Sequence, residues 1–410
     1  MIEWLKTIEQ SSLYTAALIF YGLHPMLTSV IWMVTGMTYF RRRDLSASQV
    51  TDDSYFPWVS VLIPAYCEEK LIGSMLSTVL QIDYPNFEVI VINDGSDDGT
   101  AEEIKPYLSD PRLRLLDKKI NEGKAMALND AILCARGEFL LTLDADSIPD
   151  PMVLRRMVPH FQSARVAGVA GNARVRNRRT LIAKLQAVEF TSVIGLLRRS
   201  QRIWGRVMCV SGVVGMFRKS ALVDVGMYTP GMATEDIDLT WKLQMRYYDI
   251  RYEPRAIVWM VVPETLGVWW TQRRRWALGL GQVLRRHKRI MTTWSLRRMY
   301  PLYVESFLSM VWALVFLIMT LFWCFCYAMG HAPRGGSPIP NVWGMLLVTI
   351  CLMQLACGIF IDRKYEPSIV KDSYVSILYP SFYWVLLAST CCIYTVRGIF
   401  RTLNLNAPTR

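Results

Sequence analysis

Two carboxylates, Asp144 and Asp146, directly follow the apolar run 139–143, which we predict to be a buried strand. Like charges this close repel each other unless a cation neutralises them. Mg²⁺ and Mn²⁺ favour such oxygen ligands, and Mg²⁺ is commonly held by one or two carboxylates together with substrate phosphates. The pair therefore predicts a divalent metal site that stabilises charge on a leaving diphosphate, with a structural Asp-rich turn as the alternative.

A second acidic motif, Thr234-Glu235-Asp236, lies at the start of the helical stretch 237–245. Thr234 is a favourable N-cap and Glu235 a favourable first-turn residue, so a structural role is the alternative. The chemical prediction is that Asp236 is the general base that takes the proton of an acceptor hydroxyl. With one base and a diphosphate leaving group, direct displacement with inversion is the simplest mechanism.

Three further residues could bind a nucleotide. Asp94 sits in a Gly-containing turn after the predicted strand 87–93, where its carboxylate could accept a hydrogen bond from a base N–H. Lys124 follows a glycine at a predicted helix start, where its ammonium group and the helix dipole both favour a diphosphate. Glu68, four residues after Pro64, occupies a similar turn. Helix capping for Asp94, a first-turn helix position for Glu68 and a solvated surface for Lys124 are the alternatives.

Gln272, Arg275 and Trp276 are spaced i, i+3 and i+4, so they share one face of a predicted helix. Arg275 can pair with diphosphate oxygens, and Trp276 offers a flat apolar face to a sugar ring. An interfacial Arg/Trp cluster is the alternative. Ser211 and Gly212 could line an acceptor groove, although this stretch could equally be a strand that ends in a turn.

Between residues 57 and 260, short β-rich runs alternate with helical stretches, which is typical of a mostly parallel sheet covered by helices. The predicted strands are 59–64, 87–93, 113–116 and 139–143, and the predicted helices are 69–81, 100–108 and 124–135. We expect Pro64 to end the first strand. The motifs after Pro64, at Asp94 and at Asp144 all follow strands, and the carboxyl ends of parallel strands are where such sheets bind ligands.

Hydrophobic residues make up 52% of the chain and gather in four nearly charge-free segments, 13–40, 307–330, 342–361 and 375–396. Each is long enough to cross a hydrocarbon core, which takes roughly 20 helical residues. Buried helices of a large soluble protein are the alternative.

Charged residues predict how these segments are oriented. Arg41-Arg42-Arg43, after the first segment, predicts a cytosolic location for residues 44 to about 300. Four spans place the C-terminus outside, whereas Arg397 and Arg401 favour the inside. Pro380 predicts a bent or partly re-entrant last segment.

The formal net charge is +12, and much of the excess lies in basic residues between 273 and 298 that are interleaved with tryptophans. This pattern predicts interfacial helices that face anionic lipid headgroups rather than nucleic acid, because no nucleic-acid-binding motif accompanies it. Cys324/Cys326 and Cys391/Cys392 lack the spacing of a zinc site, and we interpret the nine cysteines as small hydrophobic side chains. We expect Cys67, Cys134 and Cys209 to lie in the cytosol and to stay reduced.

In these motifs and their order, the chain resembles the processive family-2 glycosyltransferases of bacteria, which include cellulose, hyaluronan and chitin-oligosaccharide synthases. The likeness is greatest to the poly-β-1,6-N-acetylglucosamine synthases of biofilm matrices, and it covers nearly the whole chain. Further stretches that carry it are 171–176, 189–196, 210–213, 252–256 and 263–266. The resemblance implies an α/β GT-A fold, with a Rossmann-like, mostly parallel sheet and flanking transmembrane and interfacial α-helices.

The resemblance also implies roles for the residues singled out above. Asp236 would be the catalytic base, and Asp146 would bind Mg²⁺ or Mn²⁺. The residues implied in nucleotide-sugar binding are Pro64, Glu68, Asp94 (which would contact uracil), Lys124, Asp144 and Arg275. The residues implied at the acceptor end or the gate are Ser211, Gly212, Glu235, Gln272 and Trp276.

From this resemblance we expect an inverting synthase that polymerises N-acetylglucosamine from UDP-N-acetylglucosamine and exports the polysaccharide across the bacterial inner membrane. A small membrane subunit and activation by cyclic di-GMP are further implications. The expected divisions are a transmembrane segment at 1–43, a cytosolic catalytic domain at 44–262, interfacial helices at 263–302 and transmembrane helices at 303–410.

Three alternatives to this function stay open. One is a synthase of another β-linked polymer, hyaluronan-, chitin- or cellulose-like, and another is transfer of a single sugar to a lipid carrier. The third is an inactive membrane receptor that binds nucleotide or polysaccharide. The presence of both Asp146 and Asp236 favours an enzyme over a receptor.

Overall fold

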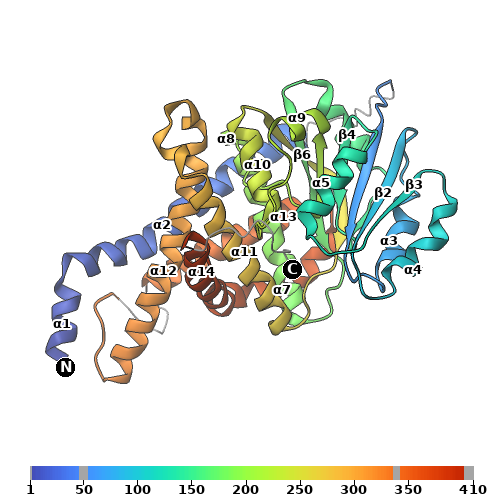
Figure 1. Ribbon diagram of the computed structural model, residues 1–410. Coiled ribbons are helices and arrows are strands. Elements are labelled where there is room, and N and C mark those ends of the chain that lie inside the picture. Colours follow the sequence, from blue (N-terminus) through green and yellow to red (C-terminus); the bar gives the residue numbers. More distant parts are fainter. Residues whose placement is uncertain (1, 46–53, 336–341, 401–410) are drawn as a thin grey trace.

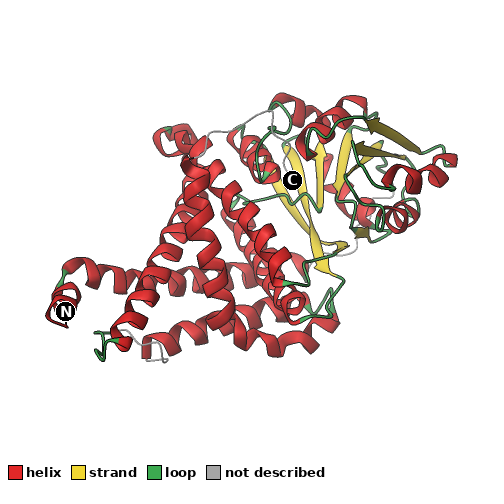
Figure 2. Ribbon diagram, turned by 60° about the horizontal axis from the view of Figure 1, so that its bottom comes forward, coloured by secondary structure: helices red, strands yellow, loops and turns green. Residues whose placement is uncertain are grey.

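The computed structural model describes residues 2–45, 54–335 and 342–400. Figures 1 and 2 show two parts side by side, a sheet with its covering helices and a body of long helices. The chain starts with α1 (Ile2–Gln10) and the long helix α2 (Ser12–Tyr39), which continues into the π-helical turn η1 (Phe40–Asp44). The other long helices follow the sheet in the sequence, so the helical body is assembled from both ends of the chain.

The sheet has eight strands in the order β3-β2-β1-β4-β7-β6-β8-β5. The strands are β1 (Val59–Ala65), β2 (Phe87–Asp94), β3 (Leu113–Lys118), β4 (Phe139–Leu143), β5 (Ile148–Pro149), β6 (Val166–Val175), β7 (Val214–Arg218) and β8 (Asp249–Met260). The β1–β2, β1–β4, β2–β3 and β6–β8 pairs are parallel, whereas β7 runs antiparallel to both of its neighbours. The four strands predicted from the sequence and the GT-A-like, mostly parallel sheet are therefore confirmed.

The central strands are apolar at nearly every position because helices cover both faces of the sheet (Figure 1). Val61 and Val89 pack into one hydrophobic cluster, and Leu62 and Ile90 pack into a second cluster on the opposite face. This alternation follows from the period of two along a strand. The helices of this part are α3 (Ile72–Val79), α4 (Thr100–Ile104), η2 (Lys105–Ser109), α5 (Lys124–Cys134), α6 (Val153–Met157), η3 (Val158–Gln162), α7 (Leu181–Phe190), η4 (Thr191–Leu196), α8 (Leu197–Trp204), α9 (Lys219–Asp224) and α10 (Glu235–Met245).

The prediction that Pro64 ends the first strand is wrong. β1 continues to Ala65, and Pro64 pairs with Ile92 of β2. On its other side, β4 pairs with β1 only as far as Leu62. A proline is tolerated here because its missing N–H falls where one neighbouring strand has already ended.

Two predicted helices are shorter than expected. The helix predicted at 69–81 is only α3, because the residues before Ile72 form a turn in which the Glu68 N–H donates to Thr100 Oγ1 at 2.8 Å. The helix predicted at 100–108 ends as an α-helix at Ile104 and continues as the 3₁₀ helix η2. Pro106, the second residue of η2, has no N–H to donate within an α-helix.

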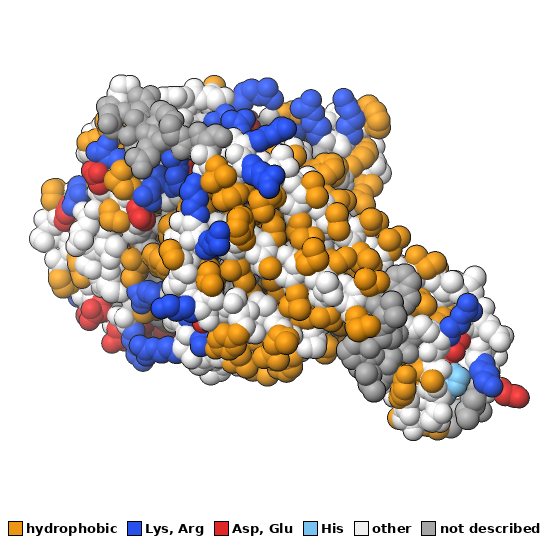
Figure 3. Space-filling model, turned by 180° about the vertical axis from the view of Figure 1, so that it is seen from behind, with side chains coloured by type: hydrophobic (Ala, Val, Ile, Leu, Met, Phe, Trp, Pro, Cys, Tyr) orange, Lys and Arg blue, Asp and Glu red, His pale blue; other side chains and the backbone are white. Residues whose placement is uncertain are grey.

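Four helical segments are long and apolar enough to cross a membrane: Ser12–Asp44, Trp294–Ala328, Gly344–Asp362 and Pro367–Phe400. They correspond to the four apolar segments of the sequence. Figure 3 shows their hydrophobic side chains as a broad apolar surface with Lys and Arg along its edges. The remaining helices of the body are α11 (Leu266–Arg286), η5 (Lys288–Thr292), η6 (Trp294–Met299), α12 (Tyr300–Ala328), α13 (Val342–Asp362), η7 (Pro367–Leu378), η8 (Tyr379–Tyr383) and α14 (Trp384–Phe400).

The last apolar segment changes helix type twice. It begins as the 3₁₀ helix η7, passes through the π-helical η8 and ends as α14. Pro380 lies in η8, where the regular α-helical hydrogen bonds are interrupted. Arg401, one of the residues used to predict the side of the C-terminus, lies outside the described residues.

Helix α11 lies against α14 with almost no side chain between the two backbones. A Cβ added at Gly281 would meet the carbonyl oxygen of Thr395, and one added at Gly398 would meet the carbonyl oxygen of Leu278. Small residues at a helix crossing permit this close approach. Helix α11 is therefore held firmly on the final apolar helix.

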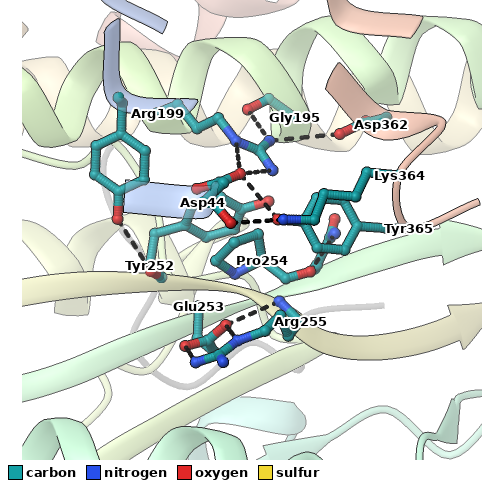
Figure 4. Close-up of polar contacts among 12 residues, drawn as sticks. Asp44, Gly195, Arg199, Tyr252, Glu253, Pro254, Arg255, Asp362, Lys364 and Tyr365 are labelled. Carbon is teal, nitrogen blue, oxygen red and sulfur yellow. Dashed lines mark hydrogen bonds and ion pairs between the residues drawn. The ribbon is translucent and has the colours of Figure 1, made fainter. Parts of the chain in front are cut away.

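A buried group of charges joins the sheet part to the helical body (Figure 4). Arg199 of α8 donates to Asp44, at the end of the first span, from Nε to Oδ2 at 2.8 Å, and to Asp362, at the end of α13, at 3.4 Å. Arg174 of β6 also donates to Asp362, at 2.5 Å. The side chains of Arg174, Arg199 and Asp362 are at most 2% exposed, so each charge depends on the others for compensation.

Gly281→Ala should lower the midpoint of thermal unfolding of the full chain in detergent. The added methyl group collides with the α14 backbone, and overpacking of this kind costs about 1–3 kcal/mol. Gly267→Ala, in the same helix, is the matched control because nothing lies within 4 Å of its added Cβ. Alanine is the better helix former, so the control should unfold at the same temperature or higher. Equal midpoints for the two variants would contradict the close packing.

Candidate active site

Asp94 ends β2 and is only 3% exposed. Its carboxylate accepts hydrogen bonds from the backbone N–H groups of Glu122, at 3.2 Å, and Gly123, at 2.8 Å. The alternative of helix capping by Asp94 is wrong, because Asp98 accepts the hydrogen bond from the Thr100 N–H at 3.0 Å. Asp94 instead holds the loop that leads into Lys124, the first residue of α5.

Lys124 lies between two carboxylates and is not a solvated surface residue. Its Nζ donates to Asp144, which follows β4, and lies 3.7 Å from Glu235 Oε1 at the start of α10. Although burial opposes the charged ammonium, Asp144 and Glu235 raise the pKa of Lys124 above its ordinary value. Burial also raises the pKa of Glu235, in spite of the nearby Lys124. One lysine therefore links the edge of the sheet to the motif 234–236.

Three acidic side chains, Glu68, Asp144 and Asp146, gather at the carboxyl ends of β1 and β4. Burial raises the pKa of Glu68 to about 7, and the charges of Asp146 and Asp144 add to this effect. Burial and then Asp144 raise the pKa of Asp146 to about 6. A divalent cation bound beside these carboxylates would favour their charged forms.

The described residues contain no group of three or more His, Cys, Asp or Glu side chains arranged to hold a metal ion by themselves. A cation at Asp146 would therefore complete its coordination with oxygens of a ligand. This is the usual situation for Mg²⁺, which keeps substrate phosphates or water among its ligands. The donor set is compatible with the predicted metal site.

Asp236 lies in the first turn of α10 and is held by the segment that precedes β7. Its Oδ2 accepts hydrogen bonds from the Gly212 N–H, at 3.2 Å, and from the Cys209 thiol, at 3.3 Å. A Cβ added at Gly212 would lie 2.8 Å from Lys124 Nζ, so this glycine sits directly between Asp236 and Lys124. Ser211 is the preceding residue, and its hydroxyl accepts a hydrogen bond from the Val213 N–H at 3.4 Å.

Thr234 occupies the N-cap position of α10, as predicted, but its side chain makes no capping hydrogen bond. Its hydroxyl is buried and has no hydrogen-bond partner among the described residues. The side chain packs instead against Gly279 of α11, where an added Cβ would collide with it. Helix α11 and the motif 234–236 are thus in direct contact.

Gln272, Arg275 and Trp276 lie on α11, as their spacing predicted. Arg275 Nη1 donates to the carbonyl oxygen of Ala233 at 3.4 Å. Its charge also reduces the rise in the pKa of Glu235 that burial causes. Gln272 Oε1 is buried and accepts no hydrogen bond in the described part of the chain. Trp276 is half-buried beside the main hydrophobic cluster.

The structure therefore brings most of the predicted residues into one chain of contacts. It runs from Asp94 through the loop to Lys124, and from there to Asp144 and Glu235. Arg275 lies beside it, hydrogen-bonded to the carbonyl oxygen of Ala233. Gly212 and Asp236 join it beside Lys124. Pro64 lies in β1 one strand away from Asp94, with the turn that carries Glu68 following it.

The prediction that the basic residues between 273 and 298 face lipid headgroups is wrong for Arg273. It is buried and forms two hydrogen bonds with Glu189 of α7, at 2.9 and 2.5 Å. Its guanidinium carbon lies 4.4 Å from the ring centre of Trp276. The Tyr383 hydroxyl donates to the same glutamate at 2.9 Å. Arg273 thus packs against Trp276 and helps to hold it in place. In the sequence, the one indication of its burial is that it follows the apolar Trp269 by four residues and so shares its face of α11.

Proteins of known description align with most of this chain. A poly-β-1,6-N-acetyl-D-glucosamine synthase of Staphylococcus epidermidis is 34% identical over 378 residues, which covers 89% of this chain and 90% of that protein. The synthase of the same description from Staphylococcus aureus (strain COL) is 35% identical over 381 residues, covering 90% and 92%.

Among solved structures, the mannosyltransferase PcManGT from Pyrobaculum calidifontis in complex with GDP-Man and Mn²⁺ has the same fold. Its TM-score is 0.61 at 20% sequence identity, and the match covers 91% of this chain and 99% of that protein. A family model described as glycosyltransferase-like family 2 matches residues 57–279. Since that region contains the whole sheet and every predicted site residue from Pro64 to Trp276, the chain belongs to glycosyltransferase family 2.

Proposed function

We propose that the protein polymerises N-acetylglucosamine from UDP-N-acetylglucosamine into poly-β-1,6-N-acetylglucosamine and exports the polymer across the bacterial inner membrane. The catalytic part would lie in the cytosol, with the spans beside it. The observation that carries the proposal is the contact chain Asp144–Lys124–Glu235 beside Asp236, in a chain that matches synthases of this description over about nine-tenths of its length. A small membrane subunit and cyclic di-GMP stay predictions of the family resemblance.

The donor would bind along the carboxyl edge of the sheet. Asp94 would contact the base, and Lys124, Asp144 and Arg275 would contact the diphosphate and the sugar. A divalent cation held by Asp146, Mg²⁺ or Mn²⁺, would neutralise charge that builds on the departing UDP. PcManGT, which has the same fold, was solved with Mn²⁺.

The acceptor would approach from the side of α11. Trp276 would stack on its terminal sugar, and the unpaired Gln272 Oε1 would accept a hydrogen bond from one of its hydroxyls, which removes the cost of a buried unsatisfied acceptor. Asp236 would take the proton of the attacking hydroxyl. As the hydroxyl oxygen bonds to C1 of the donor sugar, the bond from C1 to the diphosphate breaks on the opposite face, and the configuration inverts.

Incubation of membranes that contain the protein with single UDP-sugars and Mg²⁺ tests the proposal most directly. We expect polymer from UDP-N-acetylglucosamine alone, and we expect a glycosidase specific for β-1,6-linked N-acetylglucosamine to degrade it. A polymer resistant to that enzyme would favour another β-linked product. A single sugar on a lipid would favour the lipid-carrier alternative.

Asp236→Asn should abolish transfer and leave donor binding largely intact. Loss of a general base slows transfer by about 10²–10⁴-fold, whereas the neutral amide keeps the size of the side chain. UDP release measures the rate, and calorimetric titration with UDP-N-acetylglucosamine measures binding. Asp224→Asn, on the exposed end of α9, is the matched control and should behave as wild type. A wild-type rate in the Asp236 variant would refute its assignment as the base.

Metal removal should stop the reaction reversibly. EDTA should abolish UDP release, and added Mn²⁺ or Mg²⁺ should restore it. Asp146→Asn should raise the metal concentration needed for half-maximal rate by about tenfold or more, because one charged ligand is lost. Full activity of the EDTA-treated protein, or an unchanged metal requirement in the variant, would exclude Asp146 as a metal ligand.

Variants of the three neighbouring arginines of α11 should differ in whether they change the unfolding temperature or UDP binding. Arg273→Gln leaves Glu189 buried without its partner and should destabilise the protein by about 3–5 kcal/mol, seen as a lower unfolding temperature. Arg275→Gln should weaken UDP binding with little change in that temperature. Arg274→Gln, an exposed control, should change neither. A loss of UDP affinity in the Arg274 variant equal to that in the Arg275 variant would contradict a specific diphosphate contact.

A further inference from the structure

A pocket of about 320 Å³ lies between α2, α8 and the start of α12, apart from the residues of the candidate active site. Two arginines line it, Arg206 just after α8 and Arg298 in η6, both on the side of the sheet part. The rest of the lining is mostly apolar and includes Leu27 and Ile31 of α2 and Val304 of α12. The pocket therefore combines cations at one end with an apolar wall at the other.

Neither arginine has a carboxylate partner among the described residues. Arg206 donates from Nη1 only to the carbonyl oxygen of Gly205 at 2.7 Å, and its Nε is buried without a hydrogen bond. Burial and the nearby charge of Arg298 lower the pKa of Arg206. Asp249 acts in the opposite direction, but it is paired with Arg202 at 2.8 Å. Two adjacent guanidinium groups with free donors form a site for an anion.

Glu305 is the one carboxylate in the lining of this pocket. It follows Arg298 by seven residues, so it lies about 10 Å farther along the helix axis, beside Trp32. No ion pair joins it to Arg206 or Arg298 in the described part of the chain. The arginine end of the pocket therefore has a net positive charge.

The apolar wall belongs to two segments that could cross a membrane, Ser12–Asp44 and Trp294–Ala328. Leu27, Ile31 and Val304 are 53%, 41% and 36% exposed, so the pocket opens sideways where a bilayer would contact these helices. A polysaccharide would need polar groups along its path, whereas this wall offers mainly hydrocarbon. An anionic headgroup matches the arginine end of the pocket, and a hydrocarbon chain attached to it matches the apolar wall.

We propose that this pocket binds one anionic phospholipid, with its phosphate on Arg206 and Arg298 and an acyl chain along Leu27, Ile31 and Val304. The lipid would contact the first span, the end of α8 and the second span at once. It would therefore stabilise their assembly, and the stabilisation would depend on the headgroup charge.

The test uses the full chain, purified in detergent and stripped of lipid. It is titrated with phosphatidylglycerol or with phosphatidylcholine of the same acyl chains. Bound lipid is counted by native mass spectrometry, and the unfolding temperature is measured alongside. We expect tighter retention and a larger stabilisation with phosphatidylglycerol. The double variant Arg206→Gln/Arg298→Gln should bind it at least about tenfold more weakly, because two charge-assisted contacts are lost.

Arg297→Gln is the matched control, because Arg297 stacks on Trp294 and does not line the pocket. It should bind phosphatidylglycerol as wild type does. Ile31→Trp keeps both arginines but fills the apolar end, and it should also weaken lipid binding. The charge-preserving variant Arg206→Lys/Arg298→Lys should retain most of the preference for phosphatidylglycerol over phosphatidylcholine. It replaces the glutamine variant in the test if that variant does not fold.

Four results would overturn the proposal. The first is equal affinity for phosphatidylglycerol and phosphatidylcholine, and the second is unchanged affinity for phosphatidylglycerol in both the glutamine and the tryptophan variants. The third is full competition by inorganic phosphate with no effect of Ile31→Trp. The fourth is retention of N-acetylglucosamine oligosaccharides in place of lipid. The third would indicate a simple anion site, and the fourth would indicate a polysaccharide path.

Discussion

The assembly of this protein depends on charges that have been taken out of water. Arg174, Arg199, Asp44 and Asp362 come from a central strand, a covering helix and the ends of two different spans, and they meet where almost no solvent reaches. Removing an ion from water costs several kcal/mol unless a partner compensates it. The sheet part therefore cannot slide along the apolar helices without leaving a charge uncompensated. Figure 4 shows Arg199 between Asp44 and Asp362.

This constraint matters for chemistry because the candidate site draws residues from both parts. Lys124 and Asp144 belong to the sheet edge, whereas Arg275 and Trp276 belong to α11, which lies on the last apolar helix. Transfer between bound molecules requires groups held within a fraction of an ångström of the productive geometry. A rigid joint between the two parts would supply that precision. Arg273 adds to it, because it stacks on Trp276 and is fixed in place by its hydrogen bonds to Glu189.

Local patterns made the sheet and much of the site predictable. Apolar runs ending in Asp94 and Asp144 identified parallel strands, and the carboxyl-end rule then placed both aspartates on one edge. Residues whose partners are distant in sequence could not be predicted in this way. Arg273 meets Glu189 across 84 positions, and Arg174 meets Asp362 across 188. Helix capping was also hard to predict from the sequence, as Thr234 and Asp98 show. Several nearby residues could occupy a capping position, and tertiary packing decides which one does.

The crossing of α11 and α14 has a mechanical consequence. Gly281 and Gly398 place one main chain directly on the other, so there is no layer of flexible side chains to absorb a displacement. When the final apolar helix tilts, for instance to match a thinner or thicker bilayer, the helix that carries Gln272 must tilt with it. In a membrane, such a tilt would change the angle between Trp276 and a molecule bound beside Asp236.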